Sequence, residues 1–379
     1  MKIFLVANTD WYLYRFRSSL ATFLREQGNE VVFVSPPGRF VPNIRKQGFR
    51  WLAWQVGRQS VNPISELKAV LYLRRVYSHE NPSLVHLHTI KPVIYGSLAA
   101  KMTKIPAVVH SITGRGYVFL GQDAKARILK AIVKRMYRFV LNSPTSTTIF
   151  ENTTDRNYFL NESLISSDNS FVIEGVGVDV DRYAFSSEPD GIPVVVLAGR
   201  MLWDKGVGTF IDAVRLLRSK VNARFILIGE PDPGNPASIN VDTLHQWVNE
   251  GIVEWWGWRA DMHAVFASSH IVVLPSFGEG LPTILLEAAA TGRPIVTTDV
   301  PGCRDVVVDG STGLLVSQQD PPQLAAAIEK LIANSALRRA MGKAGREYIV
   351  QRFSSSKINR ETYDIYQKFY CSFVFNGFF

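Results

Sequence analysis

Apolar residues along the chain gather in short continuous runs that alternate with amphipathic stretches, and the alternation starts at the first residues. The run "KIFLVAN" precedes an amphipathic stretch from Phe16 to Gln27 that stops at Gly28, and the run "EVVFVSP" follows. Farther on, "SLVHLHT" and "AVVHSIT" flank a helical pattern around Tyr95 to Met102. Strands that are apolar on both faces and alternate with helices are typical of a parallel sheet covered by helices.

The same alternation starts again after a polar stretch rich in turn formers, "AFSSEPDGIP", from Ala184 to Pro193. The run "VVVLAGR" is followed by a helical pattern from about Val207 to Arg218 and by the runs "RFILIGE", "IVEWWGW", "IVVLPSF", "PIVTTDV" and "TGLLVS". We therefore predict an α/β fold with two Rossmann-like doubly wound domains. The predicted boundaries are residues 1–187 and 188–350 for the domains, and 351–379 for a C-terminal helix with an apolar tail that packs back on the first domain.

The composition sets aside several classes of protein. With 379 residues, 46% of them apolar and 20% charged, the chain has the composition of a soluble globular protein large enough for two cores. No run approaches the roughly 18 apolar residues of a membrane span, and the apolar start is too short for a signal peptide. The two cysteines, Cys303 and Cys371, give neither a disulfide framework nor a metal-ligand spacing. We expect a cytoplasmic protein.

The net charge of +9 lies entirely in the first half of the chain. Residues 1–190 hold 24 Lys and Arg against 15 Asp and Glu, whereas residues 191–379 hold 18 of each. Such asymmetry indicates that the first half meets an anionic partner: a nucleic acid, an acidic lipid surface or a phosphate-bearing substrate.

The clearest basic amphipathic stretch, "KARILKAIVKRMYRFV", runs from Lys125 to Val140. A solvated helix that packs on the sheet is the ordinary explanation of such a stretch. Together with the charge asymmetry, however, it favours peripheral contact with the anionic inner face of the cell membrane, to which each basic residue contributes about 1 kcal/mol. The basic positions at helical spacing are Arg127, Lys130, Lys134 and Arg138, and the apolar ones are Ile128, Leu129, Ile132, Val133 and Met136.

Two glutamates stand in an otherwise small and apolar segment, "SFGEGLPTILLEAAATG". Pro282 suits the first position of a helix, which places Glu279 in the loop after a strand and Glu287 in the second helical turn. Backbone N–H groups at a helix start bind anions, so a carboxylate beside them suits a ligand with both phosphate and hydroxyl groups. From the spacing alone, structural roles explain the two glutamates as well as ligand binding does. Glu279 would then be solvated near the helix dipole, and Glu287 would pair with a buried Arg. The N–H groups belong to Gly280, Leu281 and Thr283.

Arg200 and Lys205 lie in "AGRMLWDKGVGTF", where a predicted strand ends and a helix begins. The planar guanidinium and the compact ammonium, beside further helix N–H groups, suit a diphosphate. Each residue alone is more often a solvated surface cation. Together with the two glutamates, the pair favours a phosphate-binding site.

These motifs resemble those of the family-4 retaining glycosyltransferases, which have the GT-B fold of two Rossmann-like domains facing a central cleft. The family's E-x7-E motif corresponds to Glu279 and Glu287, and its diphosphate-binding cations correspond to Arg200 and Lys205. The resemblance implies that Glu279 contacts the donor sugar and that Glu287 accepts hydrogen bonds from the ribose. The sequence motifs "LWxKGV" and "PSxxEGxP" are similar to those of bacterial enzymes that add N-acetylhexosamine or hexose to polyprenyl-diphosphate-linked glycans. The other donor-binding residues that the resemblance implies are Gly199, Gly229, Glu230, Trp258, Arg259, Gly280, Leu281, Pro282 and Thr283.

The first domain carries the acceptor side in that family. His110, ending the strand "AVVH", matches a family histidine that reaches the transferred sugar; without the resemblance, a strand-end histidine held by a backbone group is the better explanation. Gly114 and Gly116 allow close approach of the backbone to a ligand, although they supply only two of the three glycines of a dinucleotide fingerprint. The loop after the first strand, "ANTDWYLYRFR", lacks the glycine pair of many relatives. Its expected acceptor contacts are Asp10, Tyr14 and Arg15.

The resemblance implies transfer of an N-acetylhexosamine or hexose from a UDP-sugar to a polyprenyl-diphosphate-linked glycan, with retention at the anomeric carbon. Preorganised cations and helix N–H groups stabilise a leaving diphosphate without a metal, and no Asp-x-Asp motif stands at a strand end, so we expect neither a metal nor a cofactor. The catalytic residues are expected to be Glu279, His110, Arg200 and Lys205.

Two alternatives fit the same residues. An enzyme similar to UDP-N-acetylglucosamine 2-epimerases shares the architecture and forms an isomer from the UDP-sugar alone. A non-enzymatic module that binds a nucleotide sugar or a nucleic acid is the other alternative. We expect no nucleic acid, because the basic half lacks both an aromatic-basic single-strand pattern and a recognition-helix motif.

Overall fold

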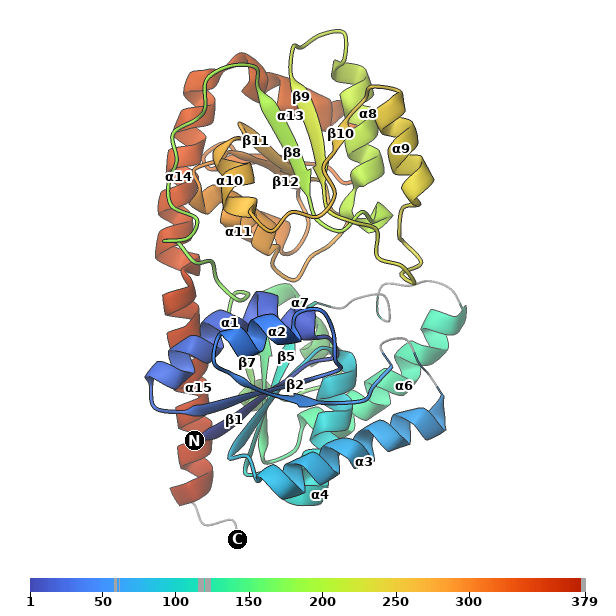
Figure 1. Ribbon diagram of the computed structural model, residues 1–379, viewed down its shortest axis with the longest axis vertical. Coiled ribbons are helices and arrows are strands. Elements are labelled where there is room, and N and C mark those ends of the chain that lie inside the picture. The colour runs from blue at the N-terminus through green and yellow to red at the C-terminus, as the bar shows by residue number, and fades with distance from the viewer. Residues whose placement is uncertain (58–59, 61, 115–118, 120–123, 376–379) are drawn as a thin grey trace. The chain divides into compact units, whose positions relative to one another are not determined.

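A computed structural model of the chain describes residues 1–57, 60, 62–114, 119 and 124–375. The chain divides into two compact units (Figure 1). Unit 1 comprises Met1–Val176 and Ser355–Phe379, and unit 2 comprises Gly177–Ser354. Each unit is an α/β structure built on its own parallel sheet.

The parallel sheet of unit 1 has the strand order β3-β2-β1-β4-β5-β6-β7 among the described residues. The order reverses between β1 and β4, and such a switch point is where doubly wound folds bind ligands, beyond the carboxyl ends of the strands. The strands are β1 (Lys2–Val6), β2 (Glu30–Ser35), β3 (Arg50–Ala53), β4 (Leu84–His88), β5 (Ala107–Ile112), β6 (Ser146–Phe150) and β7 (Ser170–Val172). The helices are α1 (Asp10–Glu26), α2 (Val41–Lys46), α3 (Pro63–Glu80), η1 (Pro92–Gly96), α4 (Ser97–Thr103), α6 (Ala124–Leu141), α7 (Thr153–Asn161), η2 (Ser167–Asn169) and α15 (Ser355–Phe375).

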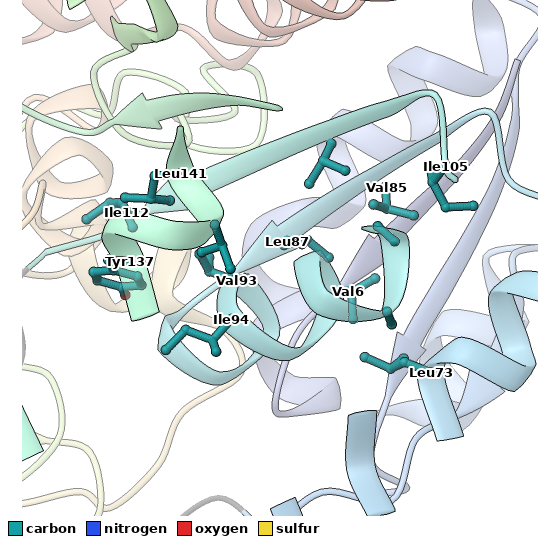
Figure 2. Close-up of a cluster of buried hydrophobic side chains, with 14 of the residues drawn as sticks. Val6, Leu73, Val85, Leu87, Val93, Ile94, Ile105, Ile112, Tyr137 and Leu141 are labelled. Atoms are coloured by element: carbon teal, nitrogen blue, oxygen red, sulfur yellow. The ribbon is translucent and has the colours of Figure 1, made fainter. Parts of the chain in front are cut away.

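Helices cover both faces of the unit 1 sheet, as the continuous apolar strands require. On one face, α3, α4 and α6 pack over Val6, Val85 and Leu87, and Figure 2 shows part of this cluster. On the other face, α1, α2 and α15 pack over Leu5, Phe33 and neighbouring strand residues. Each fully buried side chain of this size stabilises the fold by about 1.5–3 kcal/mol.

Unit 2 repeats the arrangement, with the strand order β10-β9-β8-β11-β12-β13. Its switch point lies between β8 and β11. The strands are β8 (Val194–Ala198), β9 (Arg224–Ile228), β10 (Glu254–Trp255), β11 (Ile271–Leu274), β12 (Ile295–Thr298) and β13 (Gly313–Val316). The helices are η3 (Trp203–Lys205), α8 (Val207–Leu217), α9 (Val241–Asn249), α10 (Met262–Ala267), α11 (Thr283–Ala290), α12 (Cys303–Val306), α13 (Pro321–Ala333) and α14 (Ser335–Phe353).

The unit boundaries differ from the predicted ones, which fell after residues 187 and 350. The structure places them after Val176 and Ser354. The polar stretch at residues 184–193, predicted as a linker, is bound to unit 2 instead. The buried Arg293 donates to the carbonyl oxygens of residues 186 and 187, and Arg338 forms a two-pronged ion pair with Glu188 at 2.7 and 2.8 Å. The predicted boundary after residue 187 was drawn from the turn-forming residues of this stretch, which do not form a linker.

These boundaries sharpen the charge asymmetry. Unit 1 carries 26 Lys and Arg against 13 Asp and Glu, whereas unit 2 carries 16 against 20. Unit 1 is therefore strongly basic and unit 2 mildly acidic, so the predicted anionic partner is expected to meet unit 1.

Candidate active site

Lys205 and Glu279 form an ion pair at the switch point of unit 2. Lys205 ends η3, which follows β8, and Glu279 lies in the loop that follows β11. The Lys205 Nζ lies 2.5 Å from Glu279 Oε1, and the two side chains are only 20% and 11% exposed. The sheet order brings these charges together because β8 and β11 are neighbours. The pair places a cation and an anion where a charged ligand is expected to bind.

Hydrogen bonds fasten the loop after β11 to η3. The backbone N–H of Phe277 donates to the Asp204 carbonyl at 2.8 Å, and the Ser276 hydroxyl donates to the same oxygen at 3.1 Å. Thr298, at the end of β12, donates to the Ser276 carbonyl. The ion pair is thus held by backbone on both sides, so the site is preorganised.

Gly206 connects Lys205 to α8, and no other residue fits there without strain. Its φ is +71°, and a Cβ at this position would lie 1.9 Å from the Pro275 carbonyl oxygen. We expect Gly206→Ala to lower the free energy of unfolding by at least about 2 kcal/mol, from the left-handed backbone and the clash together. Urea unfolding of the two proteins measures the difference.

Gly310→Ala is the matched control for this prediction. Gly310 has a nearly identical φ of +73°, but nothing lies within 4 Å of its added Cβ. Its substitution should therefore cost only the backbone term, about 1 kcal/mol. Equal losses for the two variants would show that contact with Pro275 is unimportant.

Helix α11 carries the second glutamate. It begins at Thr283, one residue later than predicted, and Pro282 is the N-cap residue with φ −74° and ψ 103°. Glu287 lies in the second turn as expected and is 4% exposed. The first N–H groups of α11 have no partner within the helix, which makes this terminus suitable for an anion. Leu281 and Pro282 are buried, whereas Gly280 and Thr283 are half-buried.

Arg200 lies beyond β8 but is more exposed than Lys205. Its Nη1 atom lies 2.7 Å from the Asp232 carboxylate, and 45% of the side chain is exposed. Binding of a diphosphate by this guanidinium therefore requires competition with Asp232. The Asp232 side chain is only 11% exposed, so this pair is partly buried and does not count as a surface ion pair.

The other predicted donor-binding residues gather at the same edge of the unit 2 sheet. The Gly229 N–H donates to the Gly257 carbonyl at 2.8 Å, and a Cβ on Gly229 would lie 1.8 Å from the Gly199 carbonyl. Glu230 is exposed, and its carbonyl accepts from the Met201 N–H at 3.0 Å. Trp258 is 46% exposed, and Arg259 forms a two-pronged pair with Asp261 at 2.7 and 2.9 Å.

In unit 1, His110 does not have the position that the sequence predicted. Strand β5 continues to Ile112, so His110 lies inside the strand and not at its end. The side chain is completely buried, and its ring nitrogens contact the hydroxyl groups of Ser97 at 2.8 Å and Thr148 at 3.2 Å. The predicted strand-end position of His110 is therefore wrong, whereas its contact with the transferred sugar stays a prediction.

Burial lowers the pKa of His110 to about 3, which gives a testable pH dependence. Between this value and the pKa of about 6.5 in the unfolded chain, unfolding takes up a proton, so stability falls as the pH falls. We expect His110 to contribute a slope of about 1.4 kcal/mol per pH unit in this range. Urea unfolding of wild type and His110→Gln from pH 7 to pH 5 measures this contribution. Identical slopes would contradict it.

The predicted acceptor contacts in unit 1 have mixed outcomes. Asp10 is 7% exposed, and its carboxylate oxygens accept from the N–H groups of Trp11 and Phe40 at 2.8 and 2.7 Å. These bonds tie the start of α1 to the loop before α2, which gives Asp10 a structural role, and its predicted acceptor contact stays a prediction. Tyr14 stacks on Phe40 with the ring centroids 5.3 Å apart. Tyr14 and Arg15 are half-buried, Gly114 has a φ of +111°, and Gly116 lies outside the described residues.

A polar cluster at the switch point of unit 1 was not predicted from the sequence. It contains Tyr12 and Arg17 of α1, His88 at the end of β4, and Thr89. The signal was present in "SLVHLHT", because two histidines interrupt a strand whose other residues are apolar. Buried polar residues in such a strand need partners or a ligand.

Two family descriptions match the chain, one in each unit. Residues 2–147 match "Glycosyl transferase 4-like", and residues 192–334 match "Glycosyl transferases group 1". The "N,N'-diacetylbacillosaminyl-diphospho-undecaprenol alpha-1,3-N-acetylgalactosaminyltransferase" of Campylobacter jejuni is 28% identical over 90% of this chain and 92% of its own length. The "UDP-Gal:alpha-D-GlcNAc-diphosphoundecaprenol alpha-1,3-galactosyltransferase" of Escherichia coli is 24% identical over 81% of each chain.

Solved structures share the architecture. HepE of Anabaena, in complex with UDP and glucose, aligns with a TM-score of 0.81 at 18% identity, over 97% of this chain and 99% of that one. Sucrose-phosphate synthase of Thermosynechococcus elongatus aligns with a TM-score of 0.82 at 19% identity, over 98% and 100%. Such likeness establishes the fold. With both units matched and relatives similar along nearly the whole chain, the protein is a family-4 glycosyltransferase with the GT-B fold.

Proposed function

We propose that this glycosyltransferase moves an N-acetylhexosamine or hexose from a UDP-sugar to a polyprenyl-diphosphate-linked glycan, with retention at the anomeric carbon. The observation that carries the proposal is the Lys205–Glu279 pair at the switch point of unit 2. Support for the substrates comes from relatives whose names specify sugar transfer to diphosphoundecaprenol-linked acceptors, and from a structural neighbour that binds UDP and glucose.

The site has the charges that this reaction needs. As the donor bond breaks, negative charge grows on the diphosphate and positive charge grows at the anomeric carbon. Lys205, Arg200 and the first N–H groups of α11 are suited to the diphosphate, and Glu279 is suited to the sugar. Glu287, buried on α11, is suited to the ribose hydroxyls. No protein general base is assigned, because the donor phosphate itself is able to take the acceptor proton.

A panel of radiolabelled UDP-sugars, offered with and without polyprenyl-diphosphate-sugar acceptors, tests the proposal. We expect label to enter the lipid phase with one class of donor and only when acceptor is present. The anomeric configuration of the product then tests retention. Failure of every donor in the panel would refute the proposed function.

We also propose that transfer needs no metal ion. Fixed cations and helix N–H groups supply the electrostatic stabilisation that a divalent ion gives in other transferases. Turnover measured with excess EDTA should therefore equal turnover without it. Loss of activity that added Mg²⁺ or Mn²⁺ restores would contradict this proposal.

The proposed function also includes peripheral attachment to an anionic membrane, and helix α6 supports this part. The face of α6 that is suited to the membrane differs from the predicted one. Lys134 pairs with Glu162 at 2.7 Å, Lys130 donates to the Phe119 carbonyl, and Arg138 donates to the carbonyls of residues 162 and 163. Most of the predicted basic face is therefore used within unit 1. None of the described helices is both long and apolar enough to cross a bilayer.

The outward face of α6 and the neighbouring α4 combines apolar and basic side chains, and we call it the α4–α6 patch. Ile128, Ile132 and Phe139 are 65%, 52% and 57% exposed, and Lys101 of α4 lies 4.2 Å from the centroid of the Phe139 ring. Neither helix contains an acidic residue. Exposed apolar residues among cations are typical of helices that lie in a membrane interface. The patch comprises Ile128, Ile132, Phe139 and Met102 with Lys101, Lys104, Arg127 and Arg135.

A further inference from the structure

A buried guanidinium in unit 1 has no carboxylate partner among the described residues. Arg17, in the third turn of α1, is 6% exposed. Its Nη2 donates to the Tyr12 hydroxyl at 2.7 Å, while its buried Nε has no hydrogen-bond partner. Removing a cation from water without an anionic partner costs several kcal/mol. The fold keeps this charge buried at that cost, which indicates that an anion completes the site.

His88 lies beside this guanidinium and is unsatisfied as well. It ends β4, is completely buried, and both of its ring nitrogens lack a hydrogen-bond partner. The ring lies 5.5 Å from the Tyr12 ring and 4.0 Å from the His86 ring, measured between centroids. Burial, His86 and Arg17 together hold the pKa of His88 well below its usual value. The ring is therefore neutral and keeps one N–H to donate.

The residues around Arg17 and His88 differ in whether their hydrogen-bonding groups already have partners. His86 contacts the hydroxyl groups of Tyr366 and Ser111 at 2.5 and 2.6 Å, so its nitrogens are occupied. Burial raises the pKa of Tyr12 to about 12, so its hydroxyl stays protonated and is able to donate. Glu151 is close enough to contribute to the raised pKa of Tyr12. The unsatisfied donors thus belong to Arg17 and His88.

The backbone beside His88 is strained at the same point. Thr89 has a φ of +71°, which is uncommon for a β-branched residue, and its buried hydroxyl has no partner. Strained conformations of this kind persist where the surrounding structure imposes them and gather at ligand-binding sites. Thr89 is only half-buried, so the cluster borders on solvent.

The position in the sheet agrees with a ligand site. α1 follows β1 and Thr89 follows β4, and these two strands are the neighbours at which the strand order of unit 1 reverses. The Lys205–Glu279 pair has the equivalent position in unit 2. We propose that Arg17 and His88, with Tyr12, form a phosphate-binding site in unit 1, for the diphosphate of the lipid-linked acceptor. The acceptor assignment rests on the proposed function, whereas the anion site does not.

Isothermal titration of the full chain with two probes, geranyl diphosphate and UDP, tests this site without any turnover. Arg17→Met should weaken geranyl diphosphate binding at least about tenfold and leave UDP binding unchanged, because charge-assisted hydrogen bonds are lost in unit 1 alone. Lys205→Met should weaken UDP binding and leave geranyl diphosphate binding unchanged. Loss of UDP affinity in Arg17→Met, with geranyl diphosphate binding unchanged, would overturn the acceptor assignment. Because no sugar is transferred, failure of the proposed function would leave these results unchanged.

The melting temperature separates a binding role from a structural one. Removing an unpaired buried charge should leave the melting temperature of Arg17→Met equal to or above that of the wild type, whereas a structural arginine would lower it. His88→Phe, which keeps a ring and removes both nitrogens, repeats the titration if Arg17→Met fails to fold. The proposal is overturned if the variants keep both affinities within about twofold of wild type, or if the wild type binds neither probe.

Discussion

Glu279→Ala should reduce the turnover number for sugar transfer at least about a hundredfold, in the range expected when electrostatic stabilisation at a reacting centre is lost. Glu279 is 11% exposed and lies 2.5 Å from Lys205, so its carboxylate is held in one place, which the proposed function puts beside the transferred sugar. Lys205→Ala should reduce the turnover number by a similar factor, because the leaving diphosphate loses a stabilising cation. Because the two residues act as a unit, the double variant should lose much less than the product of the single losses.

Glu347→Ala is the matched control for Glu279→Ala. Glu347 is an exposed glutamate on α14 of the same unit, so its removal changes the net charge equally without touching the site. Melting temperatures and UDP titrations of all variants show whether a variant has lost its fold or its donor binding. Near-normal turnover by both Glu279→Ala and Lys205→Ala would remove the site assignment.

The second large effect should appear in membrane binding. Neutralising three cations of the α4–α6 patch should weaken binding to phosphatidylglycerol vesicles by about a hundredfold, since each contributes about 1 kcal/mol. Replacing its three exposed apolar residues on α6 should weaken binding as well, because they enter the interface. Vesicle sedimentation measures both. The cation variant is Lys101→Gln, Arg127→Gln and Arg135→Gln, and the apolar one is Ile128→Ser, Ile132→Ser and Phe139→Ser.

The control for membrane binding removes the same charge from unit 2. Lys220, Lys330 and Lys343 are exposed there, and their combined change to glutamine should leave vesicle binding nearly intact. An equal loss for the two triple variants would mean that only net charge matters. Binding of the wild type to neutral phosphatidylcholine vesicles as strong as to anionic ones would contradict the electrostatic part of the proposal.

The strands were predictable where burial leaves a continuous apolar run. The runs that predicted β1, β2, β4 and β5 coincide with those strands, as do the runs of unit 2. Strand β6 was missed because its buried Ser146, Thr147 and Thr148 resemble loop residues in composition. Helix α1 starts earlier than predicted, since Thr9 caps it by accepting from the Tyr12 N–H at 3.2 Å.

The candidate site was predictable only where a motif fixes local structure. The loop position of Glu279 and the helical position of Glu287 followed from Pro282. The pairing of Glu279 with Lys205 joins residues 74 apart and depends on β8 lying beside β11, which no local pattern encodes. His110 was misplaced because two further strand residues follow it, and Arg17 was overlooked because its burial is a tertiary property.

Acceptor-dependent sugar transfer at the Lys205–Glu279 site is open to one paired assay. Wild type and Lys205→Met are incubated with the donor that the panel selects, with and without polyprenyl-diphosphate-sugar. We predict that label enters the lipid phase only with wild type and acceptor together. Equal labelling by both proteins, or isomerisation of the donor without any acceptor, would contradict transfer at this site.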